Sequence, residues 1–201
     1  MRKAFFIALL FASTIAVAQN IQNSFFGYKL DYSLTEKQVT ETIRDKYSRN
    51  IYFSNDNPQM VGIVDRIKFG GYEWDQTKII IYKPMQKFQG VEFTQTGTVS
   101  TNLKKRYEEL LATLTEKYGE PGMTEKTIHQ WSGKNGVIVR LEYRIEVPSD
   151  DLVSTLSQAF GQERHFDTVI LKYWSSSVEE KVKQYEKDQM KRMEQLTLNM
   201  W

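Results

Sequence analysis

Residues 137–147 carry an apolar side chain at every second position, and from Arg140 onward each position between them is charged. Successive side chains of an extended strand point to opposite faces of a sheet, so this period of two predicts a strand with one buried face and one solvated face. The apolar face is formed by Val137, Val139, Leu141, Tyr143, Ile145 and Val147. The solvated face carries Arg140, Glu142, Arg144 and Glu146.

Two helices are predicted to cover the apolar face of the sheet. Residues 103–118 place Leu103, Tyr107, Leu110, Leu111, Leu114 and Tyr118 at the three- and four-residue steps of a buried helical stripe. Gly119 and Pro121 end this helix. An earlier helix is predicted after Ser33 and Glu36, which have the spacing of a capping box.

The remaining periodic segments predict further strands. They span residues 25–30, 62–69, 74–82, 88–96, 127–131 and 167–174. In the strand 62–69, Ile63, Ile67 and Phe69 are assigned to one face. Asn135-Gly136 predicts a hairpin turn before the strand 137–147. A short helix is expected over residues 150–160.

This order of elements predicts an α+β fold. We expect a two-layer sandwich in which a mostly antiparallel sheet of about six strands carries helices on one face. Residues 19–176 would form a single α+β domain, or two α-β-β-β halves at 33–96 and 101–175.

Residues 177–201 predict a long amphipathic helix at the C-terminus, opened by a second capping box at Ser177 and Glu180. Its apolar residues recur about every seven positions, which suits packing against another helix or against the protein's own domain. Both alternatives stay open. In the first case we expect a homodimer through Val178, Val182, Tyr185, Met193 and Leu196.

The N-terminus has the pattern of a secretory signal. Arg2 and Lys3 precede the apolar segment 4–18, which ends in the small residues Ala16-Val17-Ala18. We therefore expect residues 1–18 to be a signal peptide cleaved after Ala18, and the mature protein to be periplasmic or extracellular. No later segment has the length of apolar sequence that a membrane-spanning helix needs.

Composition narrows the classes of partner. The apolar content of 40% is ordinary for a globular protein. The 27 Lys and Arg residues include Arg2 and Lys3, so without the signal the chain is formally neutral against its 25 Asp and Glu residues. Nucleic-acid binding is not expected, because the basic residues form no cluster.

Catalytic motifs are missing from the sequence. His129 and His165 do not have metal-ligand spacing, and the chain has no cysteine, nucleophile-elbow motif or phosphate-binding glycine loop. No metal, cofactor or catalytic residue is therefore predicted. A hydrolase using an unfamiliar pair of carboxylates stays an alternative, with candidates among Glu73, Asp75, Glu92, Glu142 and Glu146.

One group of residues gives a resemblance to known proteins: the helix 103–118, Gly119 and Pro121, then Trp131, Gly136 and the strand to Tyr143. It resembles small exported domains of Gram-negative bacteria. Their layout is similar to the beta-lactamase inhibitor protein and to the small lipoproteins of the outer-membrane assembly machine. This resemblance implies the α+β layout. The chain lacks the cysteines of both relatives, so no functional residue is carried over from them.

The strand 167–174 places Trp174 and Lys172 on the face opposite Val169, Leu171 and Tyr173, and Tyr82 shares a face with Lys78 and Ile80. Aromatic and basic side chains together are typical of binding surfaces, although a solvated face is the alternative. The candidate ligand-binding residues are Tyr82, Arg140, Arg144, Lys172 and Trp174.

The sequence thus favours a non-enzymatic exported binding module that recognises a protein, peptide or glycan through an open sheet face. A second alternative, beside the hydrolase, is a cell-envelope structural or assembly factor that associates through its C-terminal helix.

Overall fold

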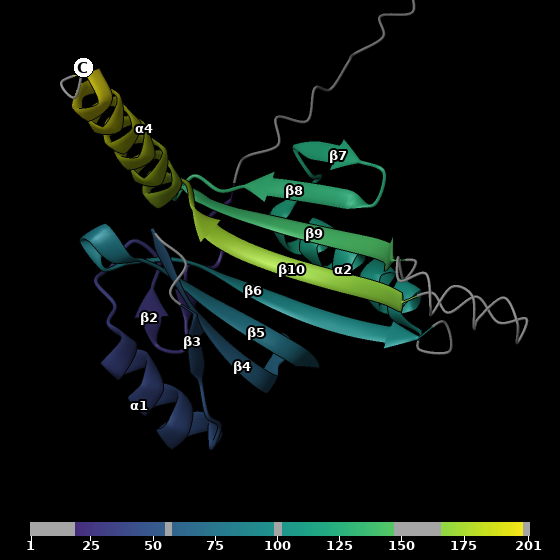
Figure 1. Cartoon of the computed structure of the whole chain (residues 1–201). Coiled ribbons are helices and arrows are strands. Elements are labelled where there is room, and N and C mark those ends of the chain that lie inside the picture. Colours follow the sequence, from purple (N-terminus) through teal and green to yellow (C-terminus); the bar gives the residue numbers. More distant parts are fainter. Residues whose placement is uncertain (1–18, 55–57, 99–101, 147–165, 199–201) are drawn as a thin grey trace, which may run out of the picture.

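An antiparallel sheet of eight strands forms the body of the protein (Figure 1). The computed structural model describes residues 19–54, 58–98, 102–146 and 166–198. The expected signal peptide, the expected helix over 150–160 and His165 lie outside these residues. In sequence order the strands are β3 (Tyr52–Ser54), β4 (Gln59–Phe69), β5 (Tyr72–Tyr82), β6 (Lys87–Thr98), β7 (Met123–Glu125), β8 (Ile128–Ser132), β9 (Val137–Glu146) and β10 (Phe166–Ser175).

The spatial order of the strands is β3-β4-β5-β6-β10-β9-β8-β7. The last strand, β10, therefore lies in the middle and pairs with β6 on one side and β9 on the other. The predicted α+β class is confirmed, with eight strands where about six were expected. The two additional strands, β3 and β7, are three residues each and form the edges. Such short segments are too brief to show a period of two.

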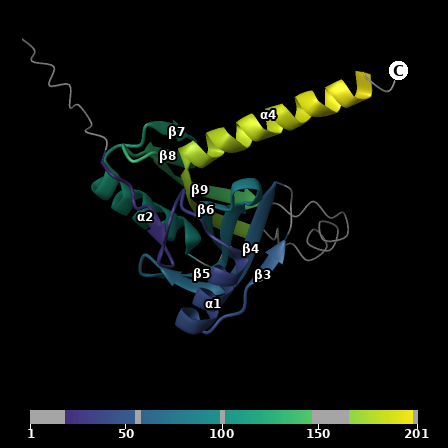
Figure 2. The same cartoon turned by 90° about the vertical axis from the view of Figure 1, so that its left-hand side faces the viewer.

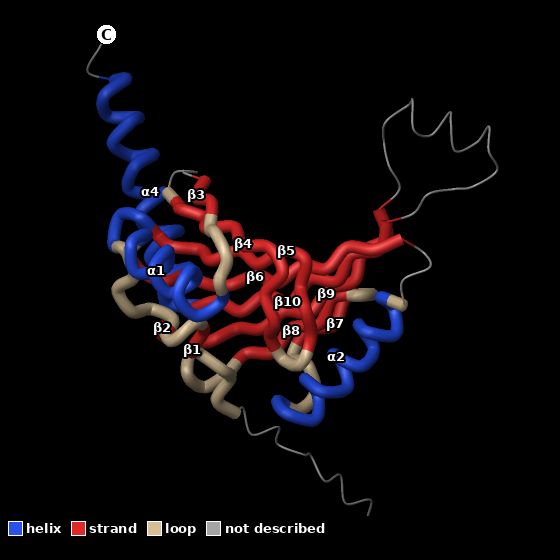
Figure 3. Tube along the Cα trace, turned by 90° about the horizontal axis from the view of Figure 1, so that it is seen from below, coloured by secondary structure: helices blue, strands red, loops and turns tan. Residues whose placement is uncertain are grey.

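The helices α1 (Glu36–Tyr47) and α2 (Leu103–Tyr118) both lie on the convex side of the curved sheet (Figure 3). Five of the six residues of the predicted stripe of α2 are buried and Leu111 is partly buried, and Gly119 with φ of 82° ends the helix. The predicted cap of α1 is wrong by two residues, because Thr35 and Gln38 form the capping box. Ser33 pairs with Lys87 of β6, which keeps it in the extended conformation.

Two other sequence predictions need correction. Residues 25–30 do not form one strand. They turn at Phe26 and Gly27, both with positive φ, so that β1 (Ser24–Phe25) pairs with β2 (Tyr28–Lys29). In β4, Arg66 has φ of 53°, and the alternation changes phase there: Val64 and Ile67 are buried, whereas Ile63 falls on the other face.

The hydrophobic core lies between the sheet and the two helices. At its centre is a group of aromatic rings, in which Phe69 and Phe93 stack with their centroids 4.3 Å apart. Phe25 contacts both rings, and Trp74 contacts Phe93. Aromatic side chains bury more apolar surface than other residues, so this cluster is a main source of the stability of the sheet-helix packing.

The C-terminal helix α4 (Ser176–Leu198) contacts the sheet only through its first turns and then projects away from it (Figure 2). Ser175 accepts the Val178 N–H, while the predicted cap Ser177 instead donates a hydrogen bond of 2.7 Å to Asp31. Burial alone would raise the pKa of Asp31, but the bonds from Ser177 and Lys181 outweigh it and lower the pKa. No helix in the described ranges is both long and apolar enough to cross a membrane.

Gly90 of β6 provides a test of the packing between the central strands. A Cβ atom at this position would lie 2.6 Å from the Tyr173 carbonyl oxygen and 3.0 Å from Trp174 Cβ. We expect Gly90→Ala to lower the free energy of unfolding by about 1–3 kcal/mol, because β10 would have to move. Urea denaturation measures this difference.

Gly122→Ala is the matched control, since a Cβ there has no neighbouring atom within 4 Å. It should change the free energy of unfolding by less than about 0.5 kcal/mol. Equal effects of the two substitutions would contradict the described contact between Gly90 and β10.

Candidate functional site

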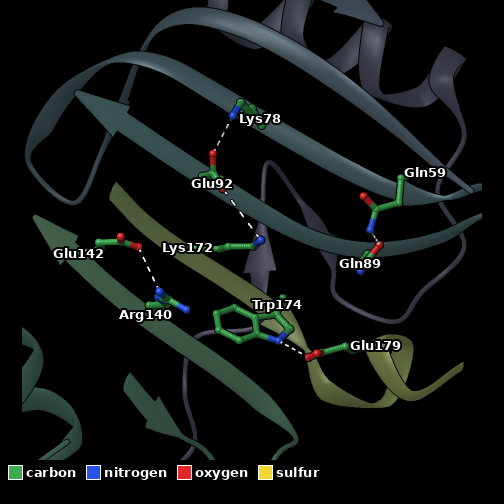
Figure 4. A network of polar contacts seen from close by, with 9 residues as sticks. All are labelled: Gln59, Lys78, Gln89, Glu92, Arg140, Glu142, Lys172, Trp174 and Glu179. Carbon is green, nitrogen blue, oxygen red and sulfur yellow. Dashed lines mark hydrogen bonds and ion pairs between the residues drawn. The ribbon is translucent and has the colours of Figure 1, made fainter. Parts of the chain in front are cut away.

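A row of charged side chains crosses the open face of the sheet (Figure 4). The strand register aligns Lys78 on β5, Glu92 on β6, Lys172 on β10 and Arg140 on β9. Lys78 Nζ lies 2.8 Å from Glu92 Oε1, and Lys172 Nζ lies 3.9 Å from Glu92 Oε2. The row exists because side chains alternate between the two faces of a strand. The residues before and after each member of the row are directed into the core, so the member itself lies on the open face.

Glu142 joins two arginines of the same strand. Its carboxylate lies 3.3 Å from Arg140 Nη2 and also accepts a short hydrogen bond from Arg144 Nε. The Glu142 residue is only 8% exposed. Burial alone would raise its pKa, but the two guanidinium groups outweigh burial and lower it. Glu142 is therefore held in the ionised form at neutral pH.

Trp174 connects the floor of this face to α4. Its indole N–H donates a 2.7 Å hydrogen bond to Glu179 Oε2 (Figure 4). Glu179 also lies 3.0 Å from Lys183. Lys172 Nζ lies 5.7 Å from the centroid of the Trp174 ring. These contacts fix the ring at the point where the helix leaves the sheet.

A hollow of about 450 Å³ lies between the sheet face and the first turns of α4. Near one end, the strand pairing shifts register after Ile80, and Gln89 accepts a 2.9 Å hydrogen bond from Gln59. The hollow is lined on the sheet side mainly by Gln59, Ile80, Gln89, Glu92, Arg140, Glu142, Arg144, Ile170, Lys172 and Trp174. Glu179, Val182, Lys183 and Glu186 of α4 form its wall.

The structure brings four of the five candidate ligand-binding residues together. Arg140, Arg144, Lys172 and Trp174 all line the hollow. Tyr82 is on the same sheet face but has no exposed surface, because Val178 and Val182 of α4 cover it. Tyr82 therefore supports the helix and does not line the hollow.

Sequence reasoning did not assign Glu92, Glu179 or the Gln59–Gln89 pair to this site. The alternation of residues 88–96 was sufficient to place Glu92 opposite Val91 and Phe93, so that signal was present. Glu179 and Gln59 come from segments whose position depends on the docking of α4 and on the strand order, which no local pattern records.

The predicted seam of α4 divides into two parts. Val178 and Val182 are buried against the protein's own sheet. Beyond them Tyr185 is partly exposed and Met193 is 64% exposed, and the side chain of Leu196 lies outside the described part. The first two residues are therefore covered within the same chain, and a homodimer through the remainder stays a prediction.

Of the five carboxylates named for a hydrolase, two line the hollow, and the hydrolase alternative stays a prediction. Glu92 and Glu142 are the carboxylates of the sheet side of the hollow, and each contacts two cations. A general acid needs a raised pKa, whereas that of Glu142 is lowered. His129 lies away from the hollow, beside the rings of Tyr107 and Trp131. Within the described ranges no cluster of His, Cys, Asp and Glu is arranged to hold a metal.

Comparison of the chain with protein-family models, with curated proteins and with solved structures found no match.

Two substitutions of Tyr82 test its supporting role. The Tyr82 hydroxyl is buried and has no hydrogen-bond partner among the described residues. Tyr82→Phe should therefore leave the free energy of unfolding unchanged or raise it slightly, because no hydrogen bond is lost. Tyr82→Ala should lower it by about 3–5 kcal/mol through the cavity under α4. Thermal and urea unfolding measure both, and a large loss in Tyr82→Phe would contradict this role.

The lowered pKa of Glu142 predicts a pH dependence of stability. A carboxyl with a lower pKa in the folded state stabilises the fold above its unfolded pKa, about 4.3, and loses this contribution as the pH falls through the folded pKa. Between neutral pH and about pH 3, wild type should lose more unfolding free energy than Glu142→Gln. The exposed Glu116→Gln is the control and should follow wild type.

Proposed function

We propose that this protein is an exported binding module that holds a protein or peptide ligand against the concave face of its sheet. One observation carries the proposal: helices α1 and α2 cover only the convex side, and the opposite side holds a hollow lined by Trp174, Arg140 and Lys172. Export rests on the sequence pattern of residues 1–18.

The floor of the hollow is preorganised for binding. Its side chains come from long paired strands, and ion pairs or hydrogen bonds hold Glu92, Glu142 and Trp174 in place. A rigid site loses less conformational entropy when a ligand binds than a flexible one does. This arrangement supports binding by a preformed site, without a large rearrangement of its side chains.

The surroundings of the hollow favour a protein ligand over a glycan. Towards the β3 edge the same face carries Ile63 and Tyr52, which pair across β4 and β3, and Tyr52 is 68% exposed. Tyrosine, tryptophan and arginine are enriched in the energetic centres of protein interfaces. Sugar rings usually need a free aromatic face, but Lys172 lies above the ring of Trp174.

A second candidate is association through the projecting part of α4. It is favoured by Met190 and Met193, which are 61% and 64% exposed on the part of the helix that leaves the sheet. In this case α4, and not the hollow, would contact the partner.

Photo-crosslinking in cells that make the protein separates these proposals. We would place p-benzoylphenylalanine at Ile170 in the hollow, at Met193 on α4, or at Lys104 on the exposed side of α2. The concave-face proposal expects an adduct of discrete mass from position 170, which is lost in the additional variant Trp174→Ala.

Position 104 is the matched control and should give no adduct. An adduct from position 193 alone would favour the α4 candidate. Equal labelling from positions 104 and 170 would contradict recognition by the concave face.

A further inference from the structure

Two cations face each other across the centre of the hollow. Lys172 on β10 and Arg140 on β9 are direct cross-strand partners, and both side chains lie on the open face (Figure 4). Like charges in this position destabilise a strand pair unless an anion lies between them. An anionic group near both side chains would therefore stabilise this pair of strands.

The neighbouring carboxylates satisfy the two cations incompletely. Glu92 lies 2.8 Å from Lys78 but 3.9 Å from Lys172, so its strong contact is with Lys78. Glu142 lies 3.3 Å from Arg140 Nη2. The Nε atom of Arg140 is buried and has no hydrogen-bond acceptor among the described residues. A buried donor without an acceptor carries a desolvation cost, so the guanidinium group of Arg140 is not fully satisfied by the described residues.

The acidic residues on the wall of the hollow do not fill this position in the structure. Glu179 accepts the Trp174 indole hydrogen bond and pairs with Lys183. Glu186 lies two turns further along α4. The charged residues that line the hollow are balanced in number, with Arg140, Arg144, Lys172 and Lys183 against Glu92, Glu142, Glu179 and Glu186. Arg140 and Lys172 are therefore distinguished by their position opposite each other on neighbouring strands, and not by an excess of positive charge in the hollow.

We propose that Lys172 and Arg140 form a subsite for an aspartate or glutamate carboxylate of a partner protein. This inference rests on the proposed function and names the chemistry that the concave face recognises. The carboxylate would lie between Lys172 Nζ and the guanidinium group of Arg140, whose side chains are 38% and 35% exposed, and would accept a charge-assisted hydrogen bond from each. Ile170 and Trp174 flank the position and offer apolar contacts to the residues beside the acid.

A peptide titration followed by NMR tests the subsite on the folded chain. The probes are the blocked pentapeptide Gly-Leu-Asp-Leu-Gly, its Asn counterpart, and inorganic phosphate alone. We expect the Asp peptide to shift the indole N–H signal of Trp174 and the backbone amide signals of Arg140 and Lys172, with the millimolar affinity of a single charged subsite. The Asn peptide should bind at least about tenfold more weakly, because it cannot replace the charged acceptor.

Substitutions then assign the effect to the two cations. Lys172→Gln and Arg140→Gln should each weaken binding of the Asp peptide about tenfold, while unfolding curves show that both variants remain folded. Lys104→Gln is the matched control: it removes a cation from the exposed side of α2 and should leave binding unchanged.

The other outcomes overturn the inference. Equal shifts from the Asp and Asn peptides would show that the face binds peptides without reading the carboxylate, and the proposed function would stand. Shifts from phosphate but not from the Asp peptide would assign the subsite to small anions. Absence of shifts at these residues with either peptide would remove the subsite, and the crosslinking result alone would then decide the proposed function.

Discussion

The pairing of β10 with both β6 and β9 is the constraint on which the rest of the structure depends. Nine pairs of aligned residues join β10 to β6, and ten join it to β9. β10 is the last strand in the sequence, but it lies in the middle of the sheet. The two halves of the sheet therefore become continuous only when this strand pairs with both of them. Its register sets Lys172 between Glu92 and Arg140, and its end at Ser175 sets the starting point of α4.

The curved sheet has two different faces as a result. The convex side is covered by α1 and α2, and the aromatic cluster around Phe69 and Phe93 fills the space between them. The concave side carries charged residues in ion pairs, and Trp174 links them to α4. A surface of this kind differs from a buried core because it combines a fixed geometry with charged groups that are partly exposed.

Much of the fold could be predicted from local patterns. The stripe of α2 and the alternation of β9 were sufficient to define two main elements, because burial on one side leaves a period in the sequence. Prediction from local patterns failed where an unusual backbone conformation, or pairing with a distant residue, determined the structure. Arg66 reverses the phase of β4 through a positive φ, Ser33 is held extended by Lys87 and cannot cap α1, and the edge strands β3 and β7 are too short to leave a period.

For the candidate site, the sequence by itself determined which side chains share a sheet face, since the direction of a side chain along a strand follows from its position alone. It placed Arg140, Arg144, Lys172 and Trp174 on open faces of their strands in this way. Only the tertiary structure decided that β9 and β10 are neighbours, that Lys172 lies opposite Arg140, and that α4 covers Tyr82. Strand order, register and helix docking depend on contacts between residues far apart in the chain, and no local period encodes those contacts.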